Sequence, residues 1–336
     1  MNLYNSKYHL QDISANTFLV TGGAGFIGSN LVQYLITHGA GHVKVLDNLS
    51  NGYYSNIEEY EGLGNFEFIK GDIRDLETCK AALAGVDYVS HQAALGSVPR
   101  SITDPITTND VNISGFLNML TAVKDTPSVK RMVYAASSST YGDSKALPKV
   151  EGEEGKALSP YAVTKAVNEM YADVFSKVYG CHTIGLRYFN IFGPKQNPDN
   201  PYAAVIPIFC KSFIDGVQPV INGDGKTSRD FTFVANAVQA NIKSMLFERL
   251  TGHEVFNVAC GGQIDLNGVI DILKQITGKD ISPIYRHERA GDVKHSLASI
   301  DKIRGAIGYE CEYSFKQGLE LVYEWYLSNN NQKVLS

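Results

Sequence analysis

Short apolar runs alternate with longer amphipathic stretches through the first half of the chain. The runs predict buried strands at residues 18–21, 43–46, 66–69, 88–90, 132–136 and 183–188. Apolar positions recur at helical spacing in residues 29–38, 76–83, 105–123 and 160–179. Strands that alternate with helices in this way predict an α/β fold with a doubly wound parallel sheet. Ligands of such sheets bind beyond the carboxyl ends of the strands.

The regular alternation ends after Gly193-Pro194, where Pro, Gly and Asn cluster. Shorter mixed elements follow. They predict a smaller C-terminal α/β substrate-binding lobe over residues 194–336, interleaved with returns to the main domain. Residues 17–193 are then expected to form a Rossmann-like nucleotide-binding domain. Residues 1–16 precede the first strand, and we expect them to pack as a short helix or an arm.

A glycine-rich turn follows the first predicted strand. Residues 22–28 read Gly-Gly-Ala-Gly-Phe-Ile-Gly and run directly into a helical stretch. Glycines permit a tight turn and close approach of the backbone to a pyrophosphate, and a helix N-terminus offers free N–H groups to the anion. The second strand ends in Asp47, where an acid that binds the ribose belongs. Because no Arg follows in residues 48–52 to receive a 2′-phosphate, we expect NAD rather than NADP.

Further cofactor contacts are expected where the following strands reach the same edge of the sheet. Asp72, after the third strand, is well placed to contact the adenine. The full set expected to bind NAD is Gly22, Gly25, Phe26, Ile27, Gly28, Asp47, Asn48, Ser50, Asn51, Gly52, Asp72, Ile73, Gln92, Ala93, Ala94, Tyr161, Lys165 and Tyr188.

Tyr161 and Lys165 are four residues apart on a predicted helix and therefore share a face. An ammonium near a phenol favours the phenolate, so we expect Lys165 to lower the tyrosine pKa from about 10. The serine loop of residues 137–139 offers hydroxyls that can hold a substrate oxygen. The spacing alone also fits a structural pair on an amphipathic helix, but the nucleotide fingerprint favours an acid/base that works beside a nicotinamide ring.

The bulk composition is ordinary for a globular enzyme, with 44% hydrophobic and 19% charged residues. A net charge of −5 and scattered Lys and Arg provide no basic field for nucleic acid or an anionic membrane, so neither partner is expected. The five cysteines and eight histidines are dispersed without metal-like spacing, so we expect no metal and structural free thiols in a reducing cytoplasm. We find no signal peptide and no apolar run of about 20 residues.

Together these motifs resemble the extended short-chain dehydrogenase/reductase family of nucleotide-sugar-modifying enzymes, over nearly the whole chain. Residues 96–101, 136–143, 158–161 and 291–298 are similar to bacterial UDP-N-acetylglucosamine and UDP-N-acetylglucosaminuronic acid 4-epimerases. The resemblance implies C4 epimerisation of UDP-GlcNAc to UDP-GalNAc, or of the corresponding uronic acids, through a transient 4-keto sugar. NAD would stay tightly bound and be regenerated each cycle. A UDP-glucose or UDP-glucuronate 4-epimerase and a net nucleotide-sugar dehydrogenase or reductase remain alternatives.

The resemblance also implies roles for the catalytic residues. Tyr161 would act as base on the sugar 4-hydroxyl, and Lys165 would hold the nicotinamide ribose. Ser137 would hydrogen-bond O4, with Ser138 and Ser139 close by. Related 4,6-dehydratases carry an Asp-Glu pair at the last two positions, so loss of water is not expected here.

On the substrate side, the resemblance implies that Arg229 and Arg289 hold the diphosphate, a task that suits a guanidinium. Surface ion pairs with Asp230 or Glu288 are the alternative. Ser296 matches a position that gates room around the C2 substituent, and a small residue there admits an N-acetyl group. The full set implied to bind the substrate is Gly96, Ser97, Val98, Arg100, Ser137, Ser138, Asn190, Ala204, Val205, Val220, Asn222, Arg229, Arg289, Asp292 and Ser296.

A homodimer is also expected from the resemblance. Residues 105–123 and 160–179 of each subunit would form a four-helix interface, because both helices carry apolar residues. Those residues could instead all face the sheet.

Overall fold

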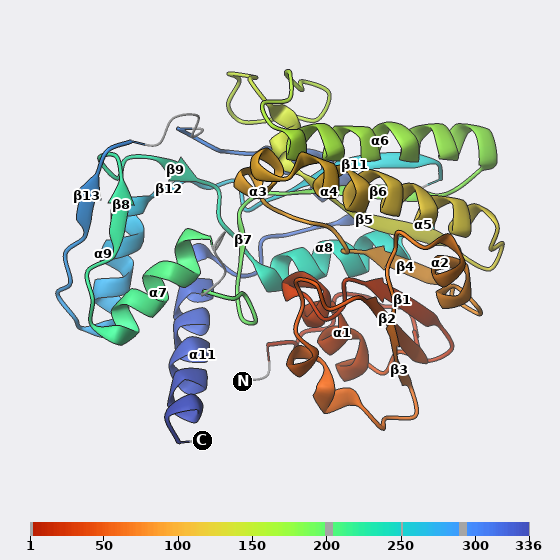
Figure 1. Ribbon diagram of the computed structural model, residues 1–336, viewed down its shortest axis with the longest axis horizontal. Helices are drawn as coiled ribbons and strands as arrows, with labels where there is room; N and C mark the ends of the chain where they lie inside the picture. The colour runs from red at the N-terminus through yellow and green to blue at the C-terminus, as the bar shows by residue number, and fades with distance from the viewer. Residues whose placement is uncertain (1–2, 199–203, 250, 289–293, 336) are drawn as a thin grey trace.

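The computed structural model describes residues 3–198, 204–249, 251–288 and 294–335. A seven-stranded parallel sheet organises the chain (Figure 1). Across the sheet the strands follow the order β11-β6-β5-β4-β1-β2-β3. Their bounds are β1 (Thr17–Thr21), β2 (His42–Asp47), β3 (Phe66–Lys70), β4 (Tyr88–His91), β5 (Arg131–Ser137), β6 (Thr183–Tyr188) and β11 (His253–Val258). This order reverses at β1, as in a doubly wound sheet, and it confirms the predicted fold class.

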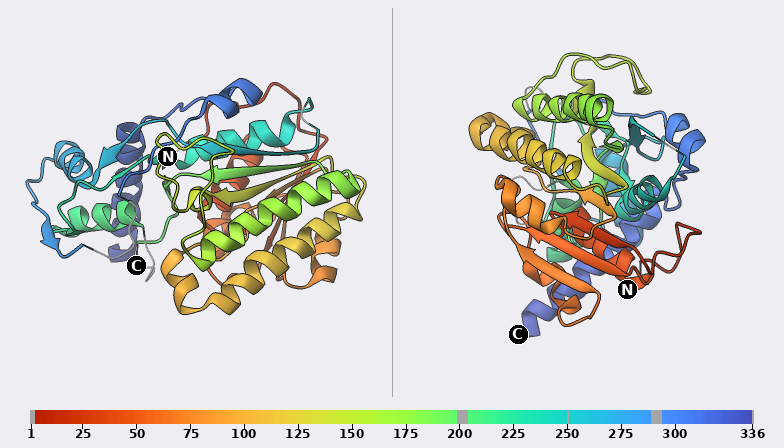
Figure 2. Two further views of the ribbon diagram at one scale, coloured as in Figure 1. Left: turned by 90° about the horizontal axis from the view of Figure 1, so that it is seen from above. Right: turned by 90° about the vertical axis from the view of Figure 1, so that its right-hand side faces the viewer.

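Helices cover both faces of this sheet (Figures 1 and 2). One layer holds α1 (Phe26–Thr37) and α8 (Val234–Leu246), and the other holds α2 (Leu76–Ala82), α5 (Gly115–Lys124) and α6 (Pro160–Tyr179). Side chains alternate along the strands between two buried cores. Phe18 and Val20 of β1 belong to the core beneath α1 and α8, and Leu19 belongs to the core beneath α2 and α5. Burial on both faces explains why these strands are nearly continuous apolar runs.

The smaller lobe lies to one side of the sheet (Figure 2, left). It contains α7 (Val205–Asp215), β8 (Val220–Asn222), β9 (Ser228–Arg229), β12 (Ile264–Asp265), α9 (Leu266–Thr277), β13 (Ile284–Arg286) and α11 (Phe315–Leu335). The pairs β8–β13 and β9–β12 form two short sheets. Between these segments the chain returns to the main layers as α8 and β11. Three short elements complete this part: β7 (Ile191–Phe192), β10 (Thr232–Phe233) and α10 (Asp301–Ile307).

The N-terminal extension is an irregular arm that packs on α1, not a helix. Tyr4 is fully buried, and its hydroxyl donates to Asn30 Oδ1 at 2.8 Å. The backbone N–H of Tyr8 donates to the Tyr34 hydroxyl at 2.7 Å. Hydrogen bonds and aromatic burial therefore fix the arm to the nucleotide-binding domain.

The predicted helix at residues 105–123 is interrupted. It forms α4 (Pro105–Asn109), a π-helical turn (Asp110–Ser114) and α5, and it is preceded by the unpredicted short helix α3 (Val98–Thr103). The π turn places Asn112 in the interior, where its side chain pairs with the backbone N–H and C=O of Leu95. A simple helical period cannot indicate the extra residue of a π turn.

The prediction that all cysteines are free is wrong. Cys260, just after β11, forms a disulfide with Cys311, which precedes α11. The two residues are 51 apart in sequence, so their spacing carried no pairing signal. The other three cysteines are free and buried. Within the described ranges, no helix is both long enough and apolar enough to cross a membrane.

Candidate active site

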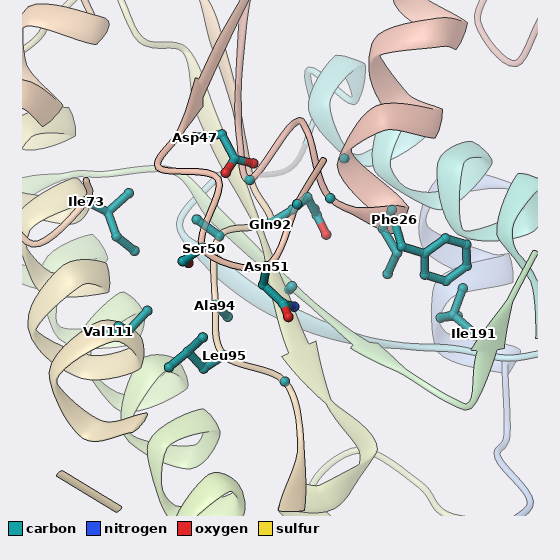
Figure 3. Close-up of a pocket in the computed structure, with 18 of the residues that line it drawn as sticks. Phe26, Asp47, Ser50, Asn51, Ile73, Gln92, Ala94, Leu95, Val111 and Ile191 are labelled. Atoms are coloured by element: carbon teal, nitrogen blue, oxygen red, sulfur yellow. The ribbon is translucent and has the colours of Figure 1, made fainter. Parts of the chain in front are cut away.

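A cavity of about 440 Å³ opens at the carboxyl ends of the central strands, where the strand order reverses. Figure 3 shows Asp47 at one end of it. Ile73, Val111 and Leu95 gather on one side, and Phe26 and Ile191 lie on the opposite side. Every residue that the sequence motifs assigned to the cofactor lines this cavity. Doubly wound sheets bind dinucleotides at this position.

The glycine-rich turn closes tightly around the start of α1. A Cβ on Gly22 would lie 2.7 Å from the backbone nitrogen of Ala93, and its φ is 66°. A Cβ on Gly28 would lie 2.2 Å from the carbonyl oxygen of Gly22. Gly25 forms the N-cap of α1 without a side chain. The turn therefore brings bare backbone to the cavity, which fits a diphosphate at the helix N-terminus.

Two carboxylates, those of Asp47 and Asp72, also line the cavity. Asp47 is 8% exposed, and it accepts hydrogen bonds from the backbone N–H of Ala24 at 3.0 Å and of Leu49 at 2.8 Å. Burial raises the pKa of Asp47 despite these bonds. Asp72 accepts from Asn48 Nδ2 at 2.8 Å and pairs with Arg74, which lowers its pKa. Asp47 is held at the end of β2, where a ribose-binding acid fits NAD.

Tyr161, Lys165 and Ser137 meet in the same cavity. Ser159 caps the helix α6, accepting from the N–H of Ala162 at 3.1 Å, and this places Tyr161 in the first turn. Ser137 ends β5 and hydrogen-bonds the Tyr161 side chain. The Lys165 Nζ lies 5.9 Å from the Tyr161 ring centroid and donates to the Ala135 carbonyl at 2.7 Å.

The expected lowering of the Tyr161 pKa is not what the protein groups produce. Burial raises the pKa of Tyr161, and the hydrogen bond with Ser137 opposes this only in part. Burial also lowers the pKa of Lys165 to about 8, with Glu169 opposing. The Lys165 ammonium donates to the Ala135 carbonyl and not to the phenol. Desolvation therefore has a larger effect on the pKa of Tyr161 than Lys165 has.

The rest of the serine loop turns away from the cavity. In the described part of the chain, Ser138 and Ser139 are outside the cavity lining, and they begin a short 3₁₀ turn. The N–H of Ser139 donates to Ser137 Oγ at 3.1 Å, which orients the one hydroxyl that faces the cavity. The Oγ of Ser139 is itself buried without a partner among the described residues.

A buried amide network supports the floor of the cavity. Asn241 of α8 donates to the Tyr188 hydroxyl at 2.7 Å, and that hydroxyl donates to Gln92 Oε1 at 3.1 Å. Gln92 Nε2 donates to Asn241 Oδ1 at 3.1 Å and to Ser90 Oγ at 3.0 Å. The network fixes Gln92 and Tyr188, both expected cofactor contacts, from the far face of the sheet.

The predicted substrate residues lie in several parts of the structure. Gly96, Ser137, Asn190 and Ala204 line the cavity. Ser97, Val98 and Arg100 lie at the start of α3, where Ser97 Oγ caps the helix by accepting from the N–H of Arg100 at 3.1 Å.

Arg100 also contacts the loop that follows β2. One of its terminal nitrogens donates to Asn51 Oδ1 at 3.3 Å. This contact links α3 to the loop after β2 across the edge of the cavity.

The other substrate positions belong to the smaller lobe and, within the described ranges, do not line the cavity. Arg229 Nη1 donates to the carbonyls of Ser228 and Lys294, at 2.9 and 3.3 Å, and the N–H of Ser296 donates to the Ser228 carbonyl at 3.1 Å. The structure thus brings Arg229 and Ser296 side by side. Val205 begins α7, and Val220 and Asn222 lie on β8. Arg289 and Asp292 lie outside the described residues.

The two carboxylates considered as ion-pair partners for the arginines have other partners among the described residues. The Asp230 carboxylate is fully buried and accepts from the backbone N–H of Cys260, Gly261 and Ala298. Burial raises the pKa of Asp230 to about 6. Glu288 pairs with Lys294 at 3.2 Å.

The sequence motifs did not identify several cavity residues, which lie both in loops and in strands or helical turns. Tyr53 and Asn56 follow the predicted loop after β2, and Lys195, Gln196 and Asn197 follow β7 directly. Polar residues next to Gly and Pro, immediately after a strand, were the signal that could have found the second group. The other missed positions are Leu46, Leu95, Val111, Ala135, Ala136 and Ile191.

Several known proteins are similar to this chain over nearly its whole length. A "Putative UDP-glucose 4-epimerase" from Methanocaldococcus jannaschii is 34% identical, covering 93% of this chain and 99% of its own. A "UDP-glucuronate 4-epimerase" from Thermodesulfobacterium geofontis is 32% identical, covering 93% and 96%. The solved UDP-N-acetylglucosamine 4-epimerase from Methanobrevibacter ruminantium M1, in complex with UDP-N-acetylmuramic acid, is 38% identical with a TM-score of 0.88, covering 94% and 99%.

Residues 18–259 match the NAD dependent epimerase/dehydratase family as a whole. This span includes the glycine-rich turn, the serine loop and the Tyr161–Lys165 pair. The match confirms the resemblance drawn from the motifs and NAD as the family's cofactor. The chain belongs to the NAD dependent epimerase/dehydratase family.

Proposed function

We propose that this protein is an NAD-dependent UDP-N-acetylhexosamine 4-epimerase. The observation that carries the proposal is the meeting of Tyr161, Lys165 and Ser137 in the cavity that holds the glycine-rich turn. A tyrosine held by a serine suits proton transfer at a sugar hydroxyl, because a general acid/base must lie within hydrogen-bond reach of the group on which it acts. When bound, NAD would supply reversible hydride transfer at C4 of the sugar.

The residues then divide the remaining work. Tyr161, as the phenolate that the positive charge of a bound nicotinamide would favour, takes the proton of the 4-hydroxyl and later returns it, so the protonation state of the enzyme is restored after each cycle. Ser137 hydrogen-bonds O4 and the tyrosine, and Lys165 holds the ribose beside the nicotinamide. Ser138 and Ser139 stand where dehydratases carry an acid pair. Their hydroxyls are poor general acids at neutral pH, which supports epimerisation without loss of water.

The N-acetylated sugar is favoured by Ser296. Ser296 lies next to Arg229, because the backbone N–H of Ser296 and the guanidinium of Arg229 both donate to the Ser228 carbonyl, and Arg229 is proposed to hold the substrate diphosphate. The similarity to a UDP-N-acetylglucosamine 4-epimerase supports the same choice. UDP-glucose and UDP-glucuronate are the rival substrates, because relatives with those names are also similar.

The test is incubation of purified protein with UDP-GlcNAc, without added NAD, with products resolved by anion-exchange chromatography or proton NMR. We expect UDP-GalNAc without net NADH. Net NADH would indicate a dehydrogenase. Conversion of UDP-glucose or UDP-glucuronate but not UDP-GlcNAc would assign the enzyme to those sugars.

A Ser296→Tyr variant tests the gate in the same assay. We expect it to lose activity on acetylated sugars and to keep any activity on UDP-glucose. Equal loss on both sugars would mean that Ser296 has no role in selecting the C2 substituent.

A further inference from the structure

Lys195 is a largely buried cation in the cavity that the sequence motifs did not identify. Among the described residues that line the cavity, the cations are Lys165 and Lys195. Lys165 lies beside Tyr161. Lys195 comes from the segment after β7, and its Nζ donates to the carbonyl of Asn56 at 3.0 Å.

Hydrogen bonds tie this lysine to the glycine-rich turn. Asn56 Nδ2 donates to the carbonyl of Ala24, within the turn, at 2.9 Å. On the other side, Asn30 Nδ2, in α1, donates to the carbonyls of Phe26 at 2.9 Å and Pro194 at 3.2 Å. Pro194, the residue before Lys195, is thus held by α1. The Lys195 ammonium contacts Asn56, which is in turn hydrogen-bonded to the glycine-rich turn.

The backbone at this position is unusual. Lys195 has a φ of 69°, a left-handed conformation that is costly for a residue with a side chain. The other non-glycine residues with positive φ in the described ranges are Leu49 and Asn190. Asn190 lines the cavity, and Leu49 lies between two residues that do. Such conformations gather where a structure holds a ligand.

We propose that Lys195 binds the diphosphate of the cofactor, opposite the backbone N–H groups of the glycine-rich turn. Burial lowers the pKa of Lys195 to about 8, with the carboxylate of Glu59 opposing this effect. An anion beside the ammonium would offset that desolvation. A helix N-terminus and one lysine together would balance the two negative charges of the diphosphate.

The inference concerns nucleotide binding, and it does not depend on which sugar is epimerised. The test is the rate at which protein-bound NAD exchanges with labelled NAD in solution. Loss of a hydrogen bond to a charged group is expected to speed exchange roughly 10- to 100-fold in Lys195→Gln. Lys195→Arg, which keeps the charge, should stay close to the wild-type rate.

Lys149→Gln is the matched control. Lys149 is also a buried lysine, but its Nζ donates to the Ser144 carbonyl, and in the described part of the chain it is outside the cavity lining. Circular dichroism verifies that each variant is folded. Unchanged exchange is expected for this control, and equal acceleration in it would overturn the proposal.

Competition binding distinguishes two roles for Lys195: a direct contact with the cofactor diphosphate, or support of the loop that contains Asn56. In competition with labelled NAD, Lys195→Gln should reduce the affinity for ADP by a factor similar to that for NAD. The affinity for adenosine, which has no diphosphate, should not change. Weakening of adenosine as well would assign Lys195 to loop positioning. A lower affinity of the NAD-bound variant for UDP, with an unchanged affinity for ADP in the competition assay, would assign Lys195 to the substrate diphosphate. Either result overturns the inference.

Discussion

At the scale of single residues, local patterns located many residues of the cavity and missed others in the loops around it. The glycine turn and Asp47 were found because each follows its strand directly, so spacing along the chain fixes its place at the sheet edge. Lys195 and Asn56 belong to loops whose paths depend on packing against each other. No periodic pattern in the sequence predicts the contact between Lys195 and Asn56.

The Tyr161–Lys165 pair shows the same limit. Its placement in the cavity followed from helical spacing, but the direction of the tyrosine pKa did not. That direction depends on how deeply the phenol is buried and on the Ala135 carbonyl that takes the ammonium. Both are properties of the folded protein.

Replacement of Tyr161 by Phe removes the proposed proton carrier and little else. We expect kcat to fall roughly 10²- to 10⁴-fold, the usual contribution of a general acid/base. Bound NAD and the affinity for UDP-GlcNAc should change little. The measurement is steady-state epimerisation, with NAD content determined after denaturation.

Tyr134→Phe is the control for this substitution. Tyr134 lies on β5 near the site, and its buried hydroxyl has no hydrogen-bond partner among the described residues. Its loss should leave turnover unchanged. Full activity in Tyr161→Phe would refute the mechanism.

At the scale of elements, the first half of the chain followed its hydrophobic pattern closely. Strands buried on both faces and amphipathic helices have distinct periods, so β1 to β6 and α6 appeared near their predicted bounds. The π turn at Asp110–Ser114 broke the pattern, because its extra residue shifts the helical phase. The limits proposed for the domains remain a prediction.

The disulfide joins two segments of the C-terminal half. Cys260 lies beside the Asp230 carboxylate, which accepts its backbone N–H at 3.0 Å. Asn236 Nδ2 lies 3.4 Å from the sulfur of Cys260 and 3.3 Å from that of Cys311. The covalent link therefore fastens the segment before α11 to the loop after β11.

Removing this link should lower stability. For a closed loop of 51 residues, chain entropy predicts a loss of about 4 kcal/mol in the free energy of unfolding for the double variant Cys260→Ser/Cys311→Ser. Urea denaturation with and without a reducing agent measures it. Reduced wild-type protein should approach the double variant, which should itself not respond to reductant. A wild type insensitive to reductant would contradict the prediction.

At the scale of the whole molecule, the cavity lies where the sheet meets the smaller lobe. The sheet and its loops supply the residues expected to bind the cofactor, and the lobe carries Arg229 and Ser296. The return of the chain through α8 and β11 ties the lobe to the sheet at several points (Figure 1). Sequence pattern indicated a second lobe, but its short strands pair only through tertiary contacts and could not be assigned individually.

The outer face of α6 carries a stripe of exposed apolar side chains, which we expect to pair with a second copy of the chain. Val163, Met170, Val174 and Val178 are 48%, 66%, 50% and 64% exposed, so these residues do not all face the sheet. Sedimentation should show a dimer at micromolar concentration, and Met170→Glu/Val174→Glu should convert it to a folded monomer by placing charges in the interface. Val217→Glu, at an exposed apolar site after α7, should remain dimeric. A monomeric wild type would rule out the dimer, and a dimeric double variant would place the interface elsewhere.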